Sequence, residues 1–189
     1  MRPTALRHVQ LGAGVFLTAL DLDRAENAQQ LREQVAEALR QDRGVLGLTK
    51  GGGALKSRPI VRHTQADGLR LPTPGATFVD GWQVTLTGTL VELRPQTLAL
   101  TLPGAWLKTE GQKTTLRLLP DLNRDAFVPR LTWVGDTLSG LMAFELRNAL
   151  CTSGLSITFT DRKEAVLPFT FEAHADTQEE VPLRLVFLE

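Results

Sequence analysis

Short alternations of apolar and polar residues dominate the last third of the chain. Large apolar side chains recur at every second position, with Ser, Thr, Arg or Glu between most of them, in residues 131–134, 138–146, 155–159, 167–171 and 183–187. This period places the apolar groups on one face of a strand, as in antiparallel sheets with one buried face. Residues 82–93 alternate in the same way, and residues 5–20 are apolar enough to form one or two further strands.

One long segment has helical periodicity instead. Leu31, Val35 and Leu39 recur at every fourth position within residues 25–41, and Arg and Glu occupy the other faces. We expect Asp23 to cap the N-terminus of this helix and Gly44 to close its C-terminus in a left-handed conformation.

Residues 94–102 are ambiguous. The alternation of leucines favours a strand, whereas Pro95 at a first helical position and the spacing of Leu98 and Leu102 favour a short helix.

Together these elements predict a mainly β fold, either an antiparallel β-sandwich or a partly closed barrel, with one flanking α-helix. A length of 189 residues fits one domain with one core. We therefore expect a single domain over residues 1–189, with an extended loop or arm over residues 45–80.

Composition narrows the possible functions. Lys and Arg total 21 and Asp and Glu total 21, so the formal net charge is zero and tight binding to nucleic acid is disfavoured. Cys151 is the only cysteine, which rules out an intrachain disulfide and predicts a small buried residue. No stretch approaches the roughly 18 apolar residues of a spanning helix, and the first ten residues lack the apolar core of a signal peptide. We expect a soluble protein with no membrane anchor.

The chain shows no recognisable catalytic motif. Residues 10–16 (QLGAGVF) match the first two glycines of a dinucleotide-binding fingerprint, but Leu17 stands at the third glycine position. His8, His63 and His174 are far apart and have no zinc-ligand spacing, and no nucleophile elbow is present. We expect no enzymatic activity, no metal and no cofactor.

Six segments stand out as an ordered set, although none of them is a chemical motif. They are GLTKGG at 47–52, VDGWQVTLTGTLVE at 79–92, LTWVGD at 131–136, FELRNAL at 144–150, GLSITF at 154–159 and LPFTFEAH at 167–174. In this order they resemble the major tail (tail tube) proteins of long-tailed bacteriophages. The resemblance also favours a short helix over residues 94–102.

The resemblance implies a viral structural protein, located in the virion tail and assembled in the host cytoplasm. Its subunits would form hexameric rings that stack into a hollow tube, with a tape-measure protein and tail terminator or tip proteins as partners. DNA would pass through the lumen without tight binding. The zero net charge is compatible with this, because each phosphate that Lys or Arg neutralises adds affinity.

Within this interpretation, residues 45–80 supply the candidate contacts between subunits. Three consecutive glycines give the backbone wide freedom, and residues 71–75 (LPTPG) predict a turn. The candidate residues are Lys50, Gly51, Gly52, Gly53, Lys56, Arg58, Arg62, Pro72 and Pro74. The segment is either a mobile hairpin with solvated cations or a reaching loop that becomes ordered only against a neighbouring subunit.

Two sets of hydroxyl side chains are candidates to line the lumen. The first set is Thr85, Thr87 and Thr89, and the second is Ser156, Thr158 and Thr160. The pattern leaves open which set faces inward.

Two alternatives remain. The tube subunit of a contractile injection system shares the same general plan. A monomeric β-sandwich module that binds a receptor or carbohydrate would present an aromatic platform, but the chain has no Tyr, and Trp82, Trp106 and Trp133 are widely separated in sequence.

Overall fold

The computed structural model of the protein describes residues 10–65, 67–68, 70–177 and 180–189. Over these residues the fold is mainly β, with a seven-stranded antiparallel sheet, a separate two-stranded sheet, two α-helices and no closed barrel. The expected mainly β, antiparallel fold is confirmed. Residues 1–9 lie outside the described residues, as do His8 and the first part of the strand expected at residues 5–20.

The large sheet brings together strands from both ends of the chain. Its order is β1 (Gln10–Leu17), β6 (Val128–Thr137), β7 (Gly140–Cys151), β8 (Leu167–Glu172), β3 (Thr77–Leu90) and β2 (Thr49–His63), and β9 (Leu183–Leu188) also pairs with β7. The small sheet pairs β4 (Ala105–Glu110) with β5 (Lys113–Leu118). The helices are α1 (Ala28–Arg40) and α2 (Pro95–Thr101), with short 3-10 helices η1 (Leu22–Arg24), η2 (Pro74–Ala76) and η3 (Arg124–Ala126).

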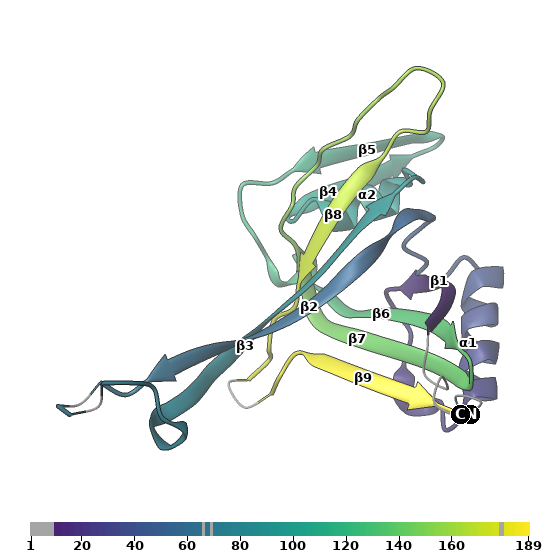
Figure 1. Cartoon of the computed structure of the whole chain (residues 1–189). Coiled ribbons are helices and arrows are strands. Elements are labelled where there is room, and N and C mark those ends of the chain that lie inside the picture. The colour runs from purple at the N-terminus through teal and green to yellow at the C-terminus, as the bar shows by residue number, and fades with distance from the viewer. Residues whose placement is uncertain (1–9, 66, 69, 178–179) are drawn as a thin grey trace.

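Strand β7 divides the large sheet into two halves. One of its edges pairs with β6, whereas the other pairs with β9 over residues 141–146 and with β8 at residues 150–151. The β9 half (β1, β6, β7 and β9) and the β3 half (β8, β3 and β2) therefore diverge from β7 and enclose the main core between them (Figure 1). Across this core the Phe16 ring meets the Phe169 ring edge to face, with 5.9 Å between centroids.

The predicted alternation of the strands accounts for this core. Val84, Leu86 and Leu90 of β3 are buried on one face, as their spacing predicts, and Leu131 and Leu146 meet them from the β9 half. The other buried members are Phe16, Leu46, Val128, Phe144, Ala149, Cys151, Leu167, Phe169, Phe171 and Ala173. Cys151 is thus a buried core residue, as expected.

Helix α1 covers the opposite face of the β9 half. Ala28 and Leu31 are buried there against Leu17, Val134 and Leu141, which form a second hydrophobic core. The expected flanking helix is confirmed, and the β9 half is covered on both faces.

The ends of α1 differ from the sequence prediction. Asn27, and not Asp23, caps the N-terminus, because its side chain accepts a hydrogen bond from the Gln30 N–H at 2.9 Å. At the C-terminus Asp42 takes the left-handed position (φ 50°) that we expected of Gly44. Gly44 also has a positive φ of 69°, but it lies beyond the helix end, where the chain turns toward β1.

Residues 94–102 form the short helix α2, with Pro95 at its first position. The Thr97 hydroxyl is buried and donates to the Leu46 carbonyl at 2.7 Å. This bond fixes α2 beside the main core, and the β4–β5 hairpin follows directly from it.

The prediction of a strand at residues 155–159 is wrong. Residues 152–166, hereafter the upper loop, project from the sheet. Thr152 still donates its N–H to the Thr170 carbonyl of β8 at 2.8 Å, and beyond it an isolated bridge joins Thr158 to Val166. One edge of β7 pairs with β6 and the other with β9 and β8. The segment that follows β7 therefore cannot pair with β7 as a further strand. Phe159 is consequently 77% exposed.

The predicted loop at residues 45–80 is largely an ordered hairpin. β2 pairs with β3 from Thr49 with Leu90 to His63 with Thr77, whereas β8 pairs with β3 only over residues 85–90. Residues 58–83, hereafter the arm, therefore extend beyond the body of the sheet (Figure 1). Residues 66 and 69 near the tip lie outside the described residues.

The positions of Phe171 and Phe159 predict a large and a small loss of stability, respectively, when each is replaced by alanine. Phe171→Ala removes a fully buried ring from the main core and should lower the free energy of unfolding by about 3–5 kcal/mol. Phe159→Ala in the upper loop should change it by less than about 0.5 kcal/mol. Urea denaturation of both variants measures the difference, and equal losses would contradict the placement of Phe159 outside the core; Ile157 of the same loop does pack against the main core.

Candidate assembly surfaces

The glycine run at 51–53 forms an irregularity at the base of the β2–β3 hairpin. The pairing register shifts between residues 49 and 53, and Gly51 and Gly52 have φ values of 79° and 75°. A Cβ atom on Gly53 would lie 2.5 Å from the carbonyl oxygen of Thr87. Side chains are therefore strained at the first two positions and sterically blocked at the third.

Beside these glycines, Lys50 joins the hairpin to the upper loop. Its Nζ lies 3.0 Å from a carboxylate oxygen of Glu164, and the hydrogen bond from Lys50 lowers the pKa of Glu164 below its ordinary value of 4.5. Lys50 is thus part of an intrachain tether, which the sequence did not predict.

The other predicted cations lie along the outer side of the hairpin. Lys56 stands opposite Thr85 and Arg58 opposite Gln83, and both cations are exposed. The Arg62 Nε lies 3.0 Å from a carboxylate oxygen of Asp80, and its guanidinium lies over the Phe78 ring at 5.4 Å. Lys56 and Arg58 form no ion pair within the described residues.

The arm also exposes hydrophobic side chains on both faces. The register shifts between Ile60 and Val61. Beyond the shift, Val61 pairs with Val79 on the same face of the hairpin as the core residues Val84 and Leu86, and Arg62 pairs with Phe78 on the opposite face. The exposed fractions are 55% for Ile60, 43% for Val61, 48% for Phe78, 54% for Val79 and 41% for Trp82. These side chains are about half exposed because the arm lies outside the body of the sheet (Figure 1), although the Arg62 guanidinium lies over the Phe78 ring.

The two predicted prolines shape the end of the arm. Pro74 opens η2, and Pro72 is exposed in the preceding turn. The Thr77 hydroxyl donates to the Thr73 carbonyl at 2.8 Å and closes the turn onto β3. Leu71 beside Pro72 is 76% exposed.

The two hydroxyl sets lie on different parts of the molecule. Thr85, Thr87 and Thr89 share the outer face of the β3 half, opposite the buried Val84 and Leu86. Thr170 and Glu172 of β8 stand beside them in register. This makes a polar sheet face.

The second set, Ser156, Thr158 and Thr160, is exposed on the upper loop and belongs to no strand. The structure therefore does not bring the two sets together.

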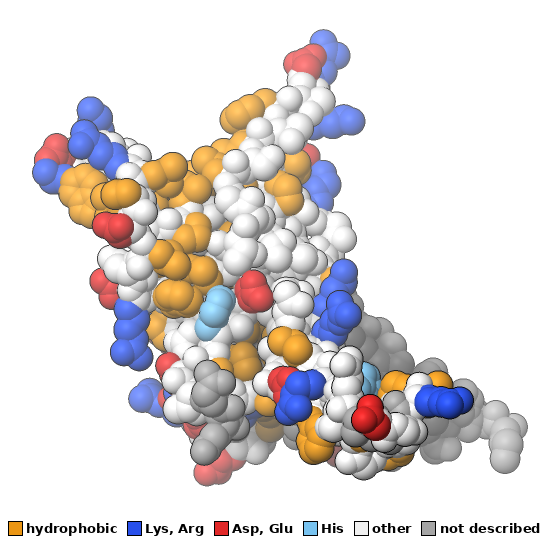
Figure 2. Space-filling view, turned by 90° about the vertical axis from the view of Figure 1, so that its left-hand side faces the viewer, with side chains coloured by type: hydrophobic (Ala, Val, Ile, Leu, Met, Phe, Trp, Pro, Cys, Tyr) orange, Lys and Arg blue, Asp and Glu red, His pale blue; other side chains and the backbone are white. Residues whose placement is uncertain are grey.

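Sequence reasoning missed a second exposed apolar region at the end opposite the arm. Figure 2 shows hydrophobic side chains gathered in the hollow between the two upper protrusions, whose tips carry charged groups. The large hydrophobic side chains exposed on β4, β5, the segment after β5 and the upper loop are Trp106 (42%), Leu118 (66%), Leu119 (47%), Leu122 (53%), Leu155 (47%) and Phe159 (77%). In the β4–β5 register Trp106 stands beside Arg117 and Leu118 beside Ala105, so Trp106 and Leu118 lie on opposite faces of the hairpin. The available signal was the charged run DRKE at 161–164 after the predicted strand, which is typical of a loop tip.

His63 and His174 have structural partners. The His63 ring nitrogen lies 3.0 Å from the Thr77 hydroxyl, and His174 contacts the Asn148 and Glu172 carbonyls. Within the described residues no group of three or more His, Cys, Asp or Glu side chains is arranged to hold a metal ion. No helix in the described part of the chain has the length and apolarity to cross a membrane.

No protein-family model matches the chain, and a search of curated proteins finds no significant match.

The Lys50–Glu164 tether predicts a pH dependence with a defined sign. Because its pKa is lowered in the folded protein, Glu164 keeps the tether above its ordinary pKa of 4.5, and the contribution is lost as the pH falls through the lowered value. An NMR titration of the Glu164 carboxyl should therefore have its midpoint below 4.5, and Lys50→Met should move it back toward 4.5. Identical midpoints in the two proteins would contradict the tether.

Proposed function

We propose that the protein is a structural subunit that self-assembles into stacked rings, the major tail protein of a long-tailed bacteriophage tail tube. The observation that carries the proposal is the arm, an ordered hairpin that leaves the body of the sheet and exposes hydrophobic side chains on both faces. A monomer gains nothing by projecting such side chains into water, whereas a neighbouring subunit would bury them.

The arrangement of the exposed regions supports ring and tube formation over a closed dimer. The arm lies at one end of the molecule, and the upper loop and the β4–β5 hairpin, which also expose hydrophobic side chains, lie at the other (Figure 1). Contacts between two different surfaces are head to tail, so they close into rings or continue as filaments. The ordered sequence resemblance supports the proposal that this assembly is a tail tube with hexameric rings.

The polar outer face of the β3 half is the better candidate for the lumen. Thr85, Thr87 and Thr89 form a continuous row on a rigid sheet, whereas the second hydroxyl set lies on a projecting loop. In this orientation α1, on the far side of the β9 half, would face outward. This face also carries Lys56 and Glu172 on either side of Thr85, so it presents charges of both signs among its hydroxyl groups. We propose that DNA slides past such a mixed face without tight binding.

The alternative of a monomeric module with an aromatic platform receives no support. Trp82 lies on the arm and Trp106 on β4, whereas Trp133 stacks on Phe144 with 5.2 Å between ring centroids at the main core. The three indoles therefore do not share one surface. A tape-measure protein and terminator or tip proteins remain the proposed partners within the virion.

Removal of the arm tests the proposal. Replacing residues 59–82 with Asn-Gly joins Arg58 to Gln83, which are paired in register, through a tight hairpin turn. We expect the variant to remain folded, with an unfolding transition like that of the intact chain, because the arm contributes no residue to the buried part of the main core.

Negative-stain microscopy of the concentrated proteins then compares assembly. The intact chain should form rings or tubes and the shortened chain should not. Tubes of normal length from the shortened chain would contradict the role of the arm, and an intact chain that stays monomeric at every concentration would contradict the proposed function itself.

A further inference from the structure

We propose that Glu145 and Thr132 form an enclosed polar site beneath η1 that holds one water molecule. Both side chains are buried, with exposed fractions of 1% for Glu145 and 0% for Thr132. Within the described residues, neither the Glu145 Oε2 atom nor the Thr132 hydroxyl has a hydrogen-bond partner. Buried polar groups in folded proteins are nearly always hydrogen-bonded, to protein or to ordered water, so two unpartnered atoms at one place indicate a common partner.

The two unpartnered atoms belong to neighbouring positions of the sheet. Thr132 of β6 pairs in register with Glu145 of β7. Both side chains lie on the face where Val134 and Ala143, two positions along the same strands, pack in the second hydrophobic core beneath α1. Residues that stand opposite each other on adjacent strands have Cβ atoms about 4.5–5.5 Å apart, so one small molecule can contact both side chains.

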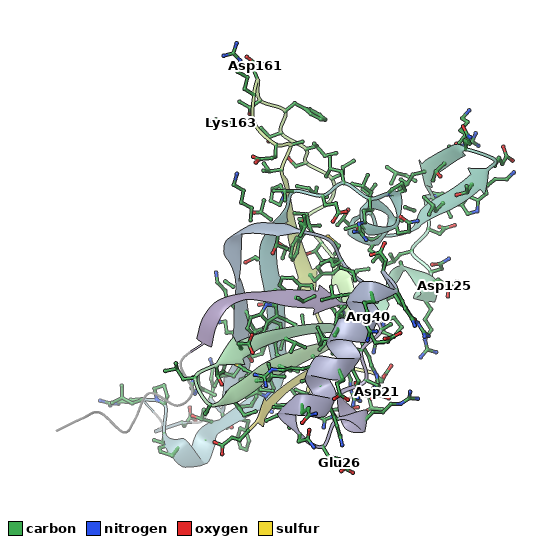
Figure 3. The ribbon with its side chains drawn as sticks, turned by 90° about the vertical axis from the view of Figure 1, so that its right-hand side faces the viewer. Asp21, Glu26, Arg40, Asp125, Asp161 and Lys163 are labelled. Atoms are coloured by element: carbon green, nitrogen blue, oxygen red, sulfur yellow. The ribbon has the colours of Figure 1, made fainter. Side chains whose placement is uncertain are left out.

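The segment η1 closes the site toward the solvent. The Asp21 carboxylate lies 2.7 Å from the Arg130 guanidinium of β6, and Asp23 forms an ion pair with Arg184 of β9. Because β7 lies between β6 and β9, these two ion pairs draw η1 across Glu145. Figure 3 shows Asp21 on the side of the β9 half that α1 covers.

The charges around the site already balance. Four arginines form ion pairs with four carboxylates: Arg24 and Arg130 with Asp21, Arg184 with Asp23, and Arg147 with Glu145 and Glu180. The Arg147 Nε lies 3.5 Å from the Glu145 Oε1 atom, so the second carboxylate oxygen remains for a further partner.

This balance selects a neutral ligand. An added cation or anion would bury a net charge, which costs far more than burying a neutral polar molecule. Water is uncharged, and it can donate to the Glu145 Oε2 atom and accept from the Thr132 hydroxyl, which gives it the two polar partners that a buried water requires. It would join β6 to β7 beneath the segment that leads into α1. The inference is independent of the proposed function, because it concerns the fold of the single chain.

The sign of a stability change tests the site. Thr132→Val removes the hydroxyl and keeps the shape of the side chain. If the hydroxyl binds the water, its loss leaves the water and Glu145 with fewer partners, and the equilibrium constant for unfolding should rise roughly three- to tenfold in urea denaturation. A constant that falls or does not change would show that an unpaired hydroxyl had been removed, and it would overturn the proposal.

A second background serves as the matched control. In a Glu145→Met chain the carboxylate oxygen is gone, whereas Arg147 keeps Glu180 as its partner. Thr132→Val should no longer raise the unfolding constant in this chain. An equal rise in both backgrounds would show that the hydroxyl acts without Glu145, which would also contradict the site.

A high-resolution crystal structure of the unaltered chain identifies the ligand. We expect one density peak within hydrogen-bonding distance of both the Glu145 Oε2 atom and the Thr132 Oγ1 atom, with the contact distances of a water molecule. A direct hydrogen bond between the hydroxyl and the carboxylate, a metal ion at this position, or no density between the two atoms would overturn the proposal.

Discussion

The division of one edge of β7 between β9 and β8 is the constraint on which the rest of the structure depends. It turns a single antiparallel sheet into two halves that enclose a core in which Phe16, Phe144 and Phe169 are buried. Since the other edge of β7 is taken by β6, the chain that follows β7 is forced outward as the upper loop. Because β8 pairs with β3 only over residues 85–90, the rest of the β2–β3 hairpin continues beyond the core as the arm.

Elements with a strong local pattern could be predicted from the sequence. The periodicities of α1 and β3 specified their type and part of their buried faces, and Pro95 correctly marked the start of α2. Leu39 at the end of the α1 stripe is 46% exposed, and Trp82 of the predicted apolar face of β3 is 41% exposed because it lies on the arm. The strand expected at residues 155–159 failed because alternation predicts a strand but not whether a neighbouring edge is free to pair with it. For the same reason the sequence did not show that the β2–β3 hairpin is ordered, since the glycines at its base look flexible until β3 is placed beside them.

The candidate inter-subunit residues of the hairpin were also only partly predictable from the sequence. The sequence identified the cations of the hairpin, but it could not show which of them form ion pairs within the chain. Lys50 binds Glu164 and Arg62 binds Asp80. Arg58 forms no ion pair within the described residues. These distinctions depend on residues far apart in the chain. The outer edge of β2 carries Lys56, Arg58 and Pro59, which are residues that discourage uncontrolled strand pairing. Assembly through exposed apolar side chains, guided by charge, would then be more selective than edge-to-edge pairing.

Self-association of unlike surfaces is the central claim, and electron cryomicroscopy of the concentrated, purified chain tests it most directly. The account predicts hexameric rings stacked into a hollow tube, with each arm buried against a neighbouring subunit. A uniform population of isolated subunits whose arms and upper loops remain in solvent at every concentration would contradict it.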